Sequence, residues 1–204
     1  MLLSDCPRQA ANRRRAGRPA PAHAGFTLVE LMITLVVLGV LVGMAAPSFS
    51  NLINSNRLTA AANEVVAAMQ VARMEAVRRN ANVVLCPSTD GAACAGTAWR
   101  EFIVFADEDG DNTVDAGTDE VIRTVAVTES GIAVNASSNL ATNHRLRFGA
   151  DGFARVGNAG ARNGGLSVCS GDVAQAENTR HVLVAVSRIN VQIAGVAACG
   201  SLTD

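Results

Sequence analysis

The chain has 204 residues, a formal net charge of −1 and 49% apolar residues, which is enough for one folded domain with an additional segment. All 17 basic residues are arginine, so Schiff-base catalysis by lysine and phosphate binding by a Walker A lysine are excluded. Tyrosine is absent and aromatic residues amount to 3%, which leaves few rings on which the bases of single-stranded nucleic acid can stack.

The charges are unevenly distributed along the chain. Residues 1–25 contain five arginines and one acidic residue, whereas the remainder carries 12 arginines and 17 acidic residues. An acidic body argues against broad binding to phosphate backbones, although it is compatible with a local patch of arginines.

An apolar run follows the basic segment. Residues 26–46 read FTLVELMITLVVLGVLVGMAA and contain one charge, Glu30. About 20 apolar residues span a bilayer as a helix, and the preceding arginines predict a cytoplasmic N-terminus and a body on the other side. A signal peptide cut near Gly43-Met44-Ala45 is the alternative. The run is longer than an ordinary signal sequence, and a carboxylate in lipid normally has a partner.

The motif GFTLVEL at residues 25–31 resembles the processing site of type IV pilins and type II secretion pseudopilins. In that family a prepilin peptidase cuts after the glycine, the new N-terminal phenylalanine is methylated, and the fifth mature residue is glutamate. The resemblance implies cleavage between Gly25 and Phe26, an assembly role for Glu30, and a helix kink at Pro47. It implies as partners other pilins in a filament, the prepilin peptidase and an inner-membrane assembly platform.

The position of Glu30 has a physical reading beside the resemblance. After cleavage, Phe26 carries a free amine and Glu30 lies one helical turn away. In lipid, the carboxylate can pair with the amine of a neighbouring subunit, which sets the axial register between stacked helices. The alternative is a surface glutamate that reaches the membrane interface.

The periodicity after Pro47 predicts that the helix resumes over residues 47–80 as an amphipathic segment. From Phe26 to about Arg79 the helix would be roughly 80 Å long. Apolar residues recur at steps of three and four, and we expect this stripe to pack against a globular head: Leu58, Ala61, Ala62, Val65, Met69, Ala72 and Ala76.

Residues 81–204 alternate short β-rich segments with Gly, Asn and Asp, which predicts antiparallel sheet. The expected fold is α+β: a long N-terminal helix, membrane-spanning in its first half, packed on an antiparallel β-sheet head in a pilin-like arrangement. The expected strands are Asn82–Leu85, Arg100–Ala106, Glu120–Val127, Ile132–Asn135, Arg145–Phe148, Gly165–Cys169 and His181–Gln192.

This head resembles the GspH/FimT group of minor pilin-like proteins. The resemblance rests on the segment 102–105 (FIVF) before an acidic loop, on 146–148 (LRF) followed by Asp151-Gly152, and on the late Ser187-Arg188. It implies a minor subunit that supports pilus assembly or protein secretion, and a body on the periplasmic side of the inner membrane.

Five cysteines are present, and Cys6 lies in the expected leader, residues 1–25. Four cysteines on the non-cytoplasmic side predict disulfides, with three possible pairings. We favour Cys86–Cys94 and Cys169–Cys199, because each pair closes a local segment. Zinc is the alternative, but the sequence has no C-x-x-C spacing.

The acidic segment 107–115 is the candidate metal site. A calcium-loop register counted from Asp109 places Asp111, Thr113 and Asp115 at ligand positions and Glu120 at the twelfth. Val114 then stands where the sharp turn requires glycine. A polar hairpin turn is therefore the favoured reading, with a weak calcium site as the alternative and no other cofactor expected.

No catalytic constellation is evident, and we do not expect an enzyme. His23 lies in the expected leader, and His144 and His181 stand at the starts of strands without a nucleophile motif nearby. The sequence therefore contains no motif that would support the alternative of a membrane-anchored periplasmic enzyme.

DNA capture is the second functional reading. Members of the resembled group linked to DNA uptake carry a late Gly-Arg-x-Arg element, and the matching stretch, residues 187–190, keeps only Arg188. Arg180 would supply a second charge on the same face if one regular strand contained both residues. We expect weak, salt-sensitive DNA binding at best.

Overall fold

The structure is a computed structural model that describes residues 25–200 and 202; within the helix, the side chains of residues 45–48 lie outside the description. The chain forms two compact units, Met1–Gly43 and Met44–Asp204. One long helix, α1 (Leu28–Arg79), contributes to both units. Pro47, where the sequence predicts a kink, lies within α1 among residues 45–48, and the expected leader, residues 1–25, lies outside the described part except for Gly25.

The first unit contains the apolar half of α1. This half includes an 18-residue window with a mean hydropathy of 2.5, and none of that window is buried within the chain. The large apolar side chains from Phe26 to Met44 are each more than half exposed. Length and apolarity thus allow this helix to cross a membrane, as the sequence predicts.

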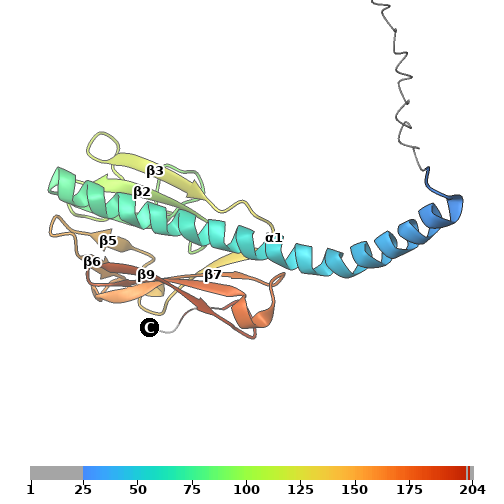
Figure 1. The fold of residues 1–204 in the computed structure, drawn as a ribbon. Coiled ribbons are helices and arrows are strands. Elements are labelled where there is room, and N and C mark those ends of the chain that lie inside the picture. Colours follow the sequence, from blue (N-terminus) through green and yellow to red (C-terminus); the bar gives the residue numbers. More distant parts are fainter. Residues whose placement is uncertain (1–24, 201, 203–204) are drawn as a thin grey trace, which may run out of the picture. The chain divides into compact units, whose positions relative to one another are not determined.

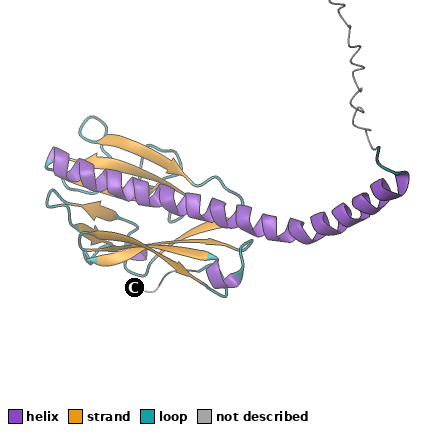
Figure 2. Ribbon diagram, viewed as in Figure 1, coloured by secondary structure: helices purple, strands orange, loops and turns teal. Residues whose placement is uncertain are grey.

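The second unit consists of the remainder of α1 and two antiparallel sheets (Figures 1 and 2). The five-stranded sheet has the order β3-β2-β1-β5-β6, and the four-stranded sheet has the order β4-β7-β8-β9. The strands are β1 (Asn82–Pro87), β2 (Glu101–Asp107), β3 (Glu120–Ala126), β4 (Ile132–Ala136), β5 (Leu146–Phe148), β6 (Ala154–Val156), β7 (Asn163–Ser170), β8 (Thr179–Ala185) and β9 (Arg188–Ala194).

The main hydrophobic core lies between this part of α1 and both sheets, and Figure 2 shows the helix running alongside their strands. Every residue of the predicted apolar stripe from Leu58 to Ala76 is buried in this core. The helix is also fastened by ion pairs to β3, where Arg79 contacts Glu120 at 2.6 Å and Glu64 contacts Arg123 at 2.5 Å. The α+β fold and its helix-on-sheet packing are confirmed.

A second, smaller core lies on the opposite face of the five-stranded sheet. Alternation along β1 and β2 directs one set of side chains to the helix and the other set away from it. The latter set is Val84, Cys86, Ile103 and Phe105, with Cys94, Val114 and Val121 packed against it. Residues 88–98 and the loop between β2 and β3 therefore have apolar anchors of their own.

The strands of the structure differ from the prediction in two places. The single strand expected over His181–Gln192 is a hairpin of β8 and β9, in which Ala185 pairs with Arg188 and leaves a two-residue loop. Strand β6 was not predicted; it pairs with β5 through Leu146 and Val156. Both differences concern the edges of the sheets.

Candidate functional site

The start of α1 contains the residues that the sequence assigns to processing and assembly. Thr27 caps the helix, because its Oγ1 accepts a hydrogen bond from the main-chain N–H of Glu30 at 3.2 Å. Thr27 and Glu30 have the spacing of a capping box. Gly25 and Phe26 precede this cap in irregular, exposed chain. A peptidase that cuts between them would leave the helix and its cap intact.

Glu30 is the one charged residue among residues 25–43, the described part of the first unit. It is exposed, and no hydrogen bond or ion pair of its carboxylate is found within residues 25–200. Apolar residues on all sides of a helix require lipid or other helices as a cover. A partner for the Glu30 carboxylate therefore has to come from outside this part of the chain.

Arg180 and Arg188 do not lie on one strand, so the predicted pair of charges is wrong. Arg180 lies in β8 and is 5% exposed. Its guanidinium donates to the carbonyl oxygen of Glu177 at 2.7 Å and to Ser55 Oγ on α1 at 3.3 Å. Arg180 thus fastens the helix to the sheet, whereas Arg188 begins β9 and is exposed.

The loop between β8 and β9 brings other arginines together. The main-chain N–H of Val186 donates to the carbonyl oxygen of Arg162 at 2.6 Å, and Arg73 on α1 donates to the carbonyl oxygen of Ser187. Arg188 follows directly. Arg162 and Arg188 are both exposed. Sequence reasoning missed Arg162, because only the pairing of β7 with β8 places it beside this loop.

The acidic segment forms the loop between β2 and β3. It brings together Asp109, Asp111 and Asp115, as the calcium-loop register predicts, with one carboxylate oxygen of each within 4.8 Å of the others. Glu120 does not join them, because its carboxylate pairs with Arg79. Val114 packs into the small core, so this position serves as an apolar anchor rather than a sharp turn.

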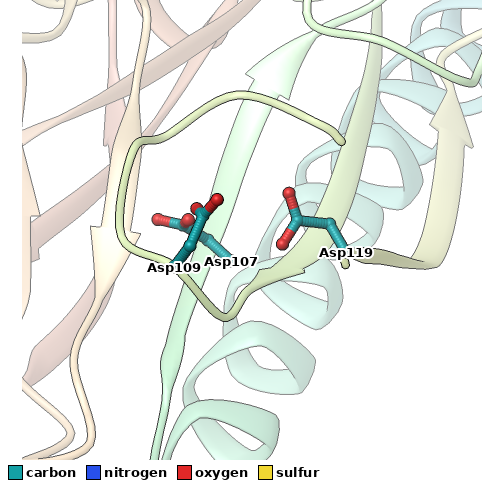
Figure 3. A group of neighbouring side chains, drawn as sticks. All are labelled: Asp107, Asp109 and Asp119. Atoms are coloured by element: carbon teal, nitrogen blue, oxygen red, sulfur yellow. The ribbon is translucent and has the colours of Figure 1, made fainter. Parts of the chain in front are cut away.

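A second group in the same loop consists of Asp107, Asp109 and Asp119 (Figure 3). Neither Asp107 nor Asp119 was among the predicted ligands: Asp107 lies in the candidate segment two residues before the counted register, and Asp119 occupies its eleventh position. Burial, and then the charges of Asp119 and Asp109, raise the pKa of Asp107. The charges of Asp111 and Asp109, together with slight burial, raise the pKa of Asp115. Negative charge is therefore concentrated here.

The cysteines form the two pairs that the sequence favours. Cys86 is joined to Cys94 with a Cα–Cα distance of 5.5 Å, and Cys169 to Cys199 at 5.6 Å. The first bond holds residues 88–93 over the small core. The second attaches the C-terminal segment to β7.

The two histidines of the head, His144 and His181, are half-buried. Trp99 Nε1 donates a hydrogen bond to His144 Nδ1 at 3.3 Å, which identifies this ring nitrogen as an acceptor. Burial and the neighbouring Arg145 lower the pKa of His144, and burial lowers the pKa of His181.

A long apolar helix with Glu30 in its first turn, packed in its second half on an antiparallel head, defines a pilin-like protein. Residues 61–189 match the model of the family described as Type II transport protein GspH, and residues 21–46 match the Prokaryotic N-terminal methylation motif. The first match covers more than half of the chain, and the chain belongs to the Type II transport protein GspH family.

Two known proteins are similar to this chain. The Pilin-like protein PilA1 of Thermus thermophilus is 38% identical over 95 residues, which are 46% of this chain and 54% of PilA1. The chain thus matches about half the length of this relative. The type IV minor pilin FimU of Pseudomonas aeruginosa PAO1 has the same fold, with a TM-score of 0.50 and 18% identity over 71% of this chain and 96% of FimU.

Proposed function

We propose that the chain is a minor subunit of a type IV pilus or a type II secretion pseudopilus that takes part in initiating the filament or forming its tip. Before assembly, the first half of α1 anchors it in the inner membrane with the N-terminus in the cytoplasm and the head in the periplasm. The prepilin peptidase cleaves after Gly25, the amine of Phe26 is methylated, and the assembly platform moves the subunit into the filament.

One observation carries this proposal: the first half of α1 exposes its apolar side chains on every side and places one carboxylate, Glu30, in its first turn. Lipid covers such a surface before assembly, and neighbouring helices cover it in a filament. An ionised acid within a membrane helix is costly unless it is paired, so pairing with the Phe26 amine of a neighbour favours one register.

Replacing Glu30 by alanine tests the pairing. The change makes the anchor more apolar, so we expect membrane insertion and both head disulfides to persist while Glu30→Ala is lost from the sheared filament fraction. Thr34→Val is the matched control, because Thr34 lies one turn further along and its Oγ1 donates a hydrogen bond within the same helix, to the Leu31 carbonyl oxygen. Incorporation of Glu30→Ala at the wild-type level would contradict the proposal.

Processing has a direct measurement. The intact mass of protein extracted from membranes should correspond to residues 26–204 with one added methyl group. A mature chain that begins at Ala46 would instead indicate ordinary signal peptidase and a secreted head.

A second candidate function is DNA contact at the loop between β8 and β9. The observation that favours it is the placement of two exposed arginines beside this loop: Arg162, whose carbonyl oxygen accepts the Val186 N–H, and Arg188, the first residue of β9. Phosphate contacts need such charges, and they give binding that depends strongly on salt. We rank this function below filament assembly.

A further inference from the structure

The loop between β2 and β3 places the carboxylates of Asp107, Asp109 and Asp119 against one another. One oxygen of each lies within 4.8 Å of the others. Figure 3 shows the three side chains within the curve of the loop. None of the ion pairs found in residues 25–200 includes any of these three acids, so their charges are not balanced by an arginine at contact distance.

Asp107 is the independent sign of a missing ligand. Its side chain is 1% exposed, and Oδ1 accepts a hydrogen bond from the Gly110 N–H at 2.9 Å. Oδ2 is also buried and has no hydrogen-bond partner. A buried carboxylate oxygen without a partner is costly, and its two acidic neighbours add repulsion. A bound cation would satisfy Oδ2 and remove the repulsion together.

The loop is built so that the acids are held in place. Asp119 accepts the N–H of Glu108 on Oδ1 at 3.1 Å and the N–H of Asp115 on Oδ2 at 2.9 Å, which fastens both ends of the loop. Gly110, with φ of 85°, provides the left-handed turn between Asp109 and Asp111. Val114 anchors the middle of the loop in the small core. The loop would therefore need little further ordering of its backbone when an ion binds.

The ligand chemistry selects the ion. Every candidate ligand is an oxygen, and hard divalent cations prefer oxygen ligands. Calcium accepts six to eight oxygens in flexible geometry, whereas magnesium requires a near-ideal octahedron. A loop with irregular spacing between its carboxylates therefore suits calcium. Arg145 approaches this loop, but its guanidinium donates to the carbonyl oxygen of Asn112 rather than to a carboxylate.

We propose that Asp107, Asp109 and Asp119 bind one calcium ion, with Asp111 and Asp115 adding negative charge beside it. This set differs from a register counted along the sequence, because it uses the end of β2 and the residue before β3. The ion would join the end of β2 to the start of β3 and so stabilise the edge of the five-stranded sheet that β3 forms.

The test uses the full chain purified in detergent and freed of metal with a chelator. Calorimetric titration with calcium chloride should show one ion per chain, with a Kd of about 10⁻⁴–10⁻³ M as in extracellular calcium modules. At about 100 times the Kd, the Tm should rise by roughly 5–10 °C. Magnesium chloride should bind at least about tenfold more weakly.

Three variants identify the site. Asp107→Asn and Asp109→Asn should abolish the calorimetric signal and the calcium-dependent rise in Tm. Asp109 is exposed, so its variant remains informative even where the buried substitution impairs folding. Glu108→Gln is the matched control, because it removes one charge from the same loop outside the cluster, and it should bind calcium like the wild type. Absence of calcium binding, equal affinity for magnesium, or unchanged binding by Asp109→Asn would each overturn the proposal.

Discussion

Arg73 on α1 donates a hydrogen bond from Nη1 to the main-chain carbonyl oxygen of Ser187 at 2.5 Å. This bond joins the helix to the loop between β8 and β9, 114 residues further along the chain. In the same loop, the Val186 N–H donates to the Arg162 carbonyl oxygen, and the Val186 carbonyl oxygen accepts a hydrogen bond from the Ala154 N–H. Contacts from α1, from β6 and from the residue before β7 therefore meet at Val186 and Ser187. The loop is therefore held by tertiary contacts rather than by its own turn residues.

Removal of the Arg73 bond should destabilise the head. A hydrogen bond from a charged group contributes about 1.5–3 kcal/mol, so we expect Arg73→Ala to lower the free energy of unfolding by about that amount. Arg57→Ala is the control, since Arg57 is exposed on the same helix. Guanidinium unfolding of the full chain in detergent measures both. Equal stability of the two variants would show that the bond contributes nothing.

Val186 should be a strained position. Its φ is 56°, a left-handed conformation that is rare for a β-branched residue and costs about 1–2 kcal/mol. Glycine removes this cost and adds about 0.5–1 kcal/mol of backbone entropy, so Val186→Gly should be neutral or stabilising by up to about 1 kcal/mol. Val191→Gly, at a residue of similar exposure within β9, should destabilise by about 1 kcal/mol. Equal decreases of unfolding free energy in the two variants would contradict the strain.

The strain at Val186 also explains why the hairpin was not predicted. Residues 181–192 are rich in β-branched side chains and have no Gly, Pro or Asn-Gly pair at the bend, so the pattern indicates one strand. Two-residue hairpin loops with positive φ normally use glycine or asparagine. Here contacts from α1, β6 and β7 force the turn, and such contacts are not visible in a local pattern. Strand β6 was not predicted for a similar reason: it has only three residues, and its pairing with β5 rather than a local pattern makes it a strand.

Features with strong local signals were predictable. The burial of Leu58 and Ala76 follows from helical periodicity, because a regular helix turns every fourth residue toward the same face. Asp109, Asp111 and Asp115 lie together as the calcium-loop register predicts, because neighbours in a short loop cannot lie far apart, whereas Glu120 pairs with Arg79. Asp119 and Arg162 were missed because strand pairing, rather than sequence distance, places them at their sites.

Acidification should destabilise the head through His144 and His181. Burial, with the charge of Arg145 for His144, lowers the pKa of both below the ordinary value of 6.5. The native state then binds fewer protons than the unfolded chain below about pH 6.5. Stability from these groups is thus complete above that pH and is lost as pH falls. The Tm in detergent should decrease between pH 7.5 and 5, and less steeply in His144→Gln.

Trp99 offers a second readout of the same titration. It is the single tryptophan, it is fully buried, and its indole N–H donates to His144 Nδ1. Protonation of Nδ1 removes this acceptor, so tryptophan fluorescence should change below pH 6.5 before global unfolding. An emission that is unchanged with pH in the wild type, or changes equally in His144→Gln, would contradict the assignment.

DNA binding, if the second candidate function holds, should depend on Arg162 and Arg188 and not on Arg180. The guanidinium of Arg180 is bonded to Ser55 and Glu177 inside the head, so Arg180→Ala should lower stability by about 1–3 kcal/mol. Ala185 of β8 pairs on one side with Arg188 of β9 and on the other side with Asn163, the first residue of β7, which follows Arg162. One exposed arginine thus lies on each side of β8, where each can contact a phosphate.

Salt dependence measures these phosphate contacts. Removing one arginine that binds a phosphate reduces the slope of log K against log salt by about one, so the double variant Arg162→Ala/Arg188→Ala should reduce it by about two. Arg57→Ala, an exposed arginine on α1, should leave the slope unchanged. The titration uses the full chain in detergent with duplex DNA, starting at about 50 mM salt, where phosphate contacts are strongest. The slope follows the number of counterions that the bound arginines release. An equal slope in the double variant and the wild type would therefore exclude this loop as a DNA contact. Absence of DNA binding at about 50 mM salt would exclude it as well.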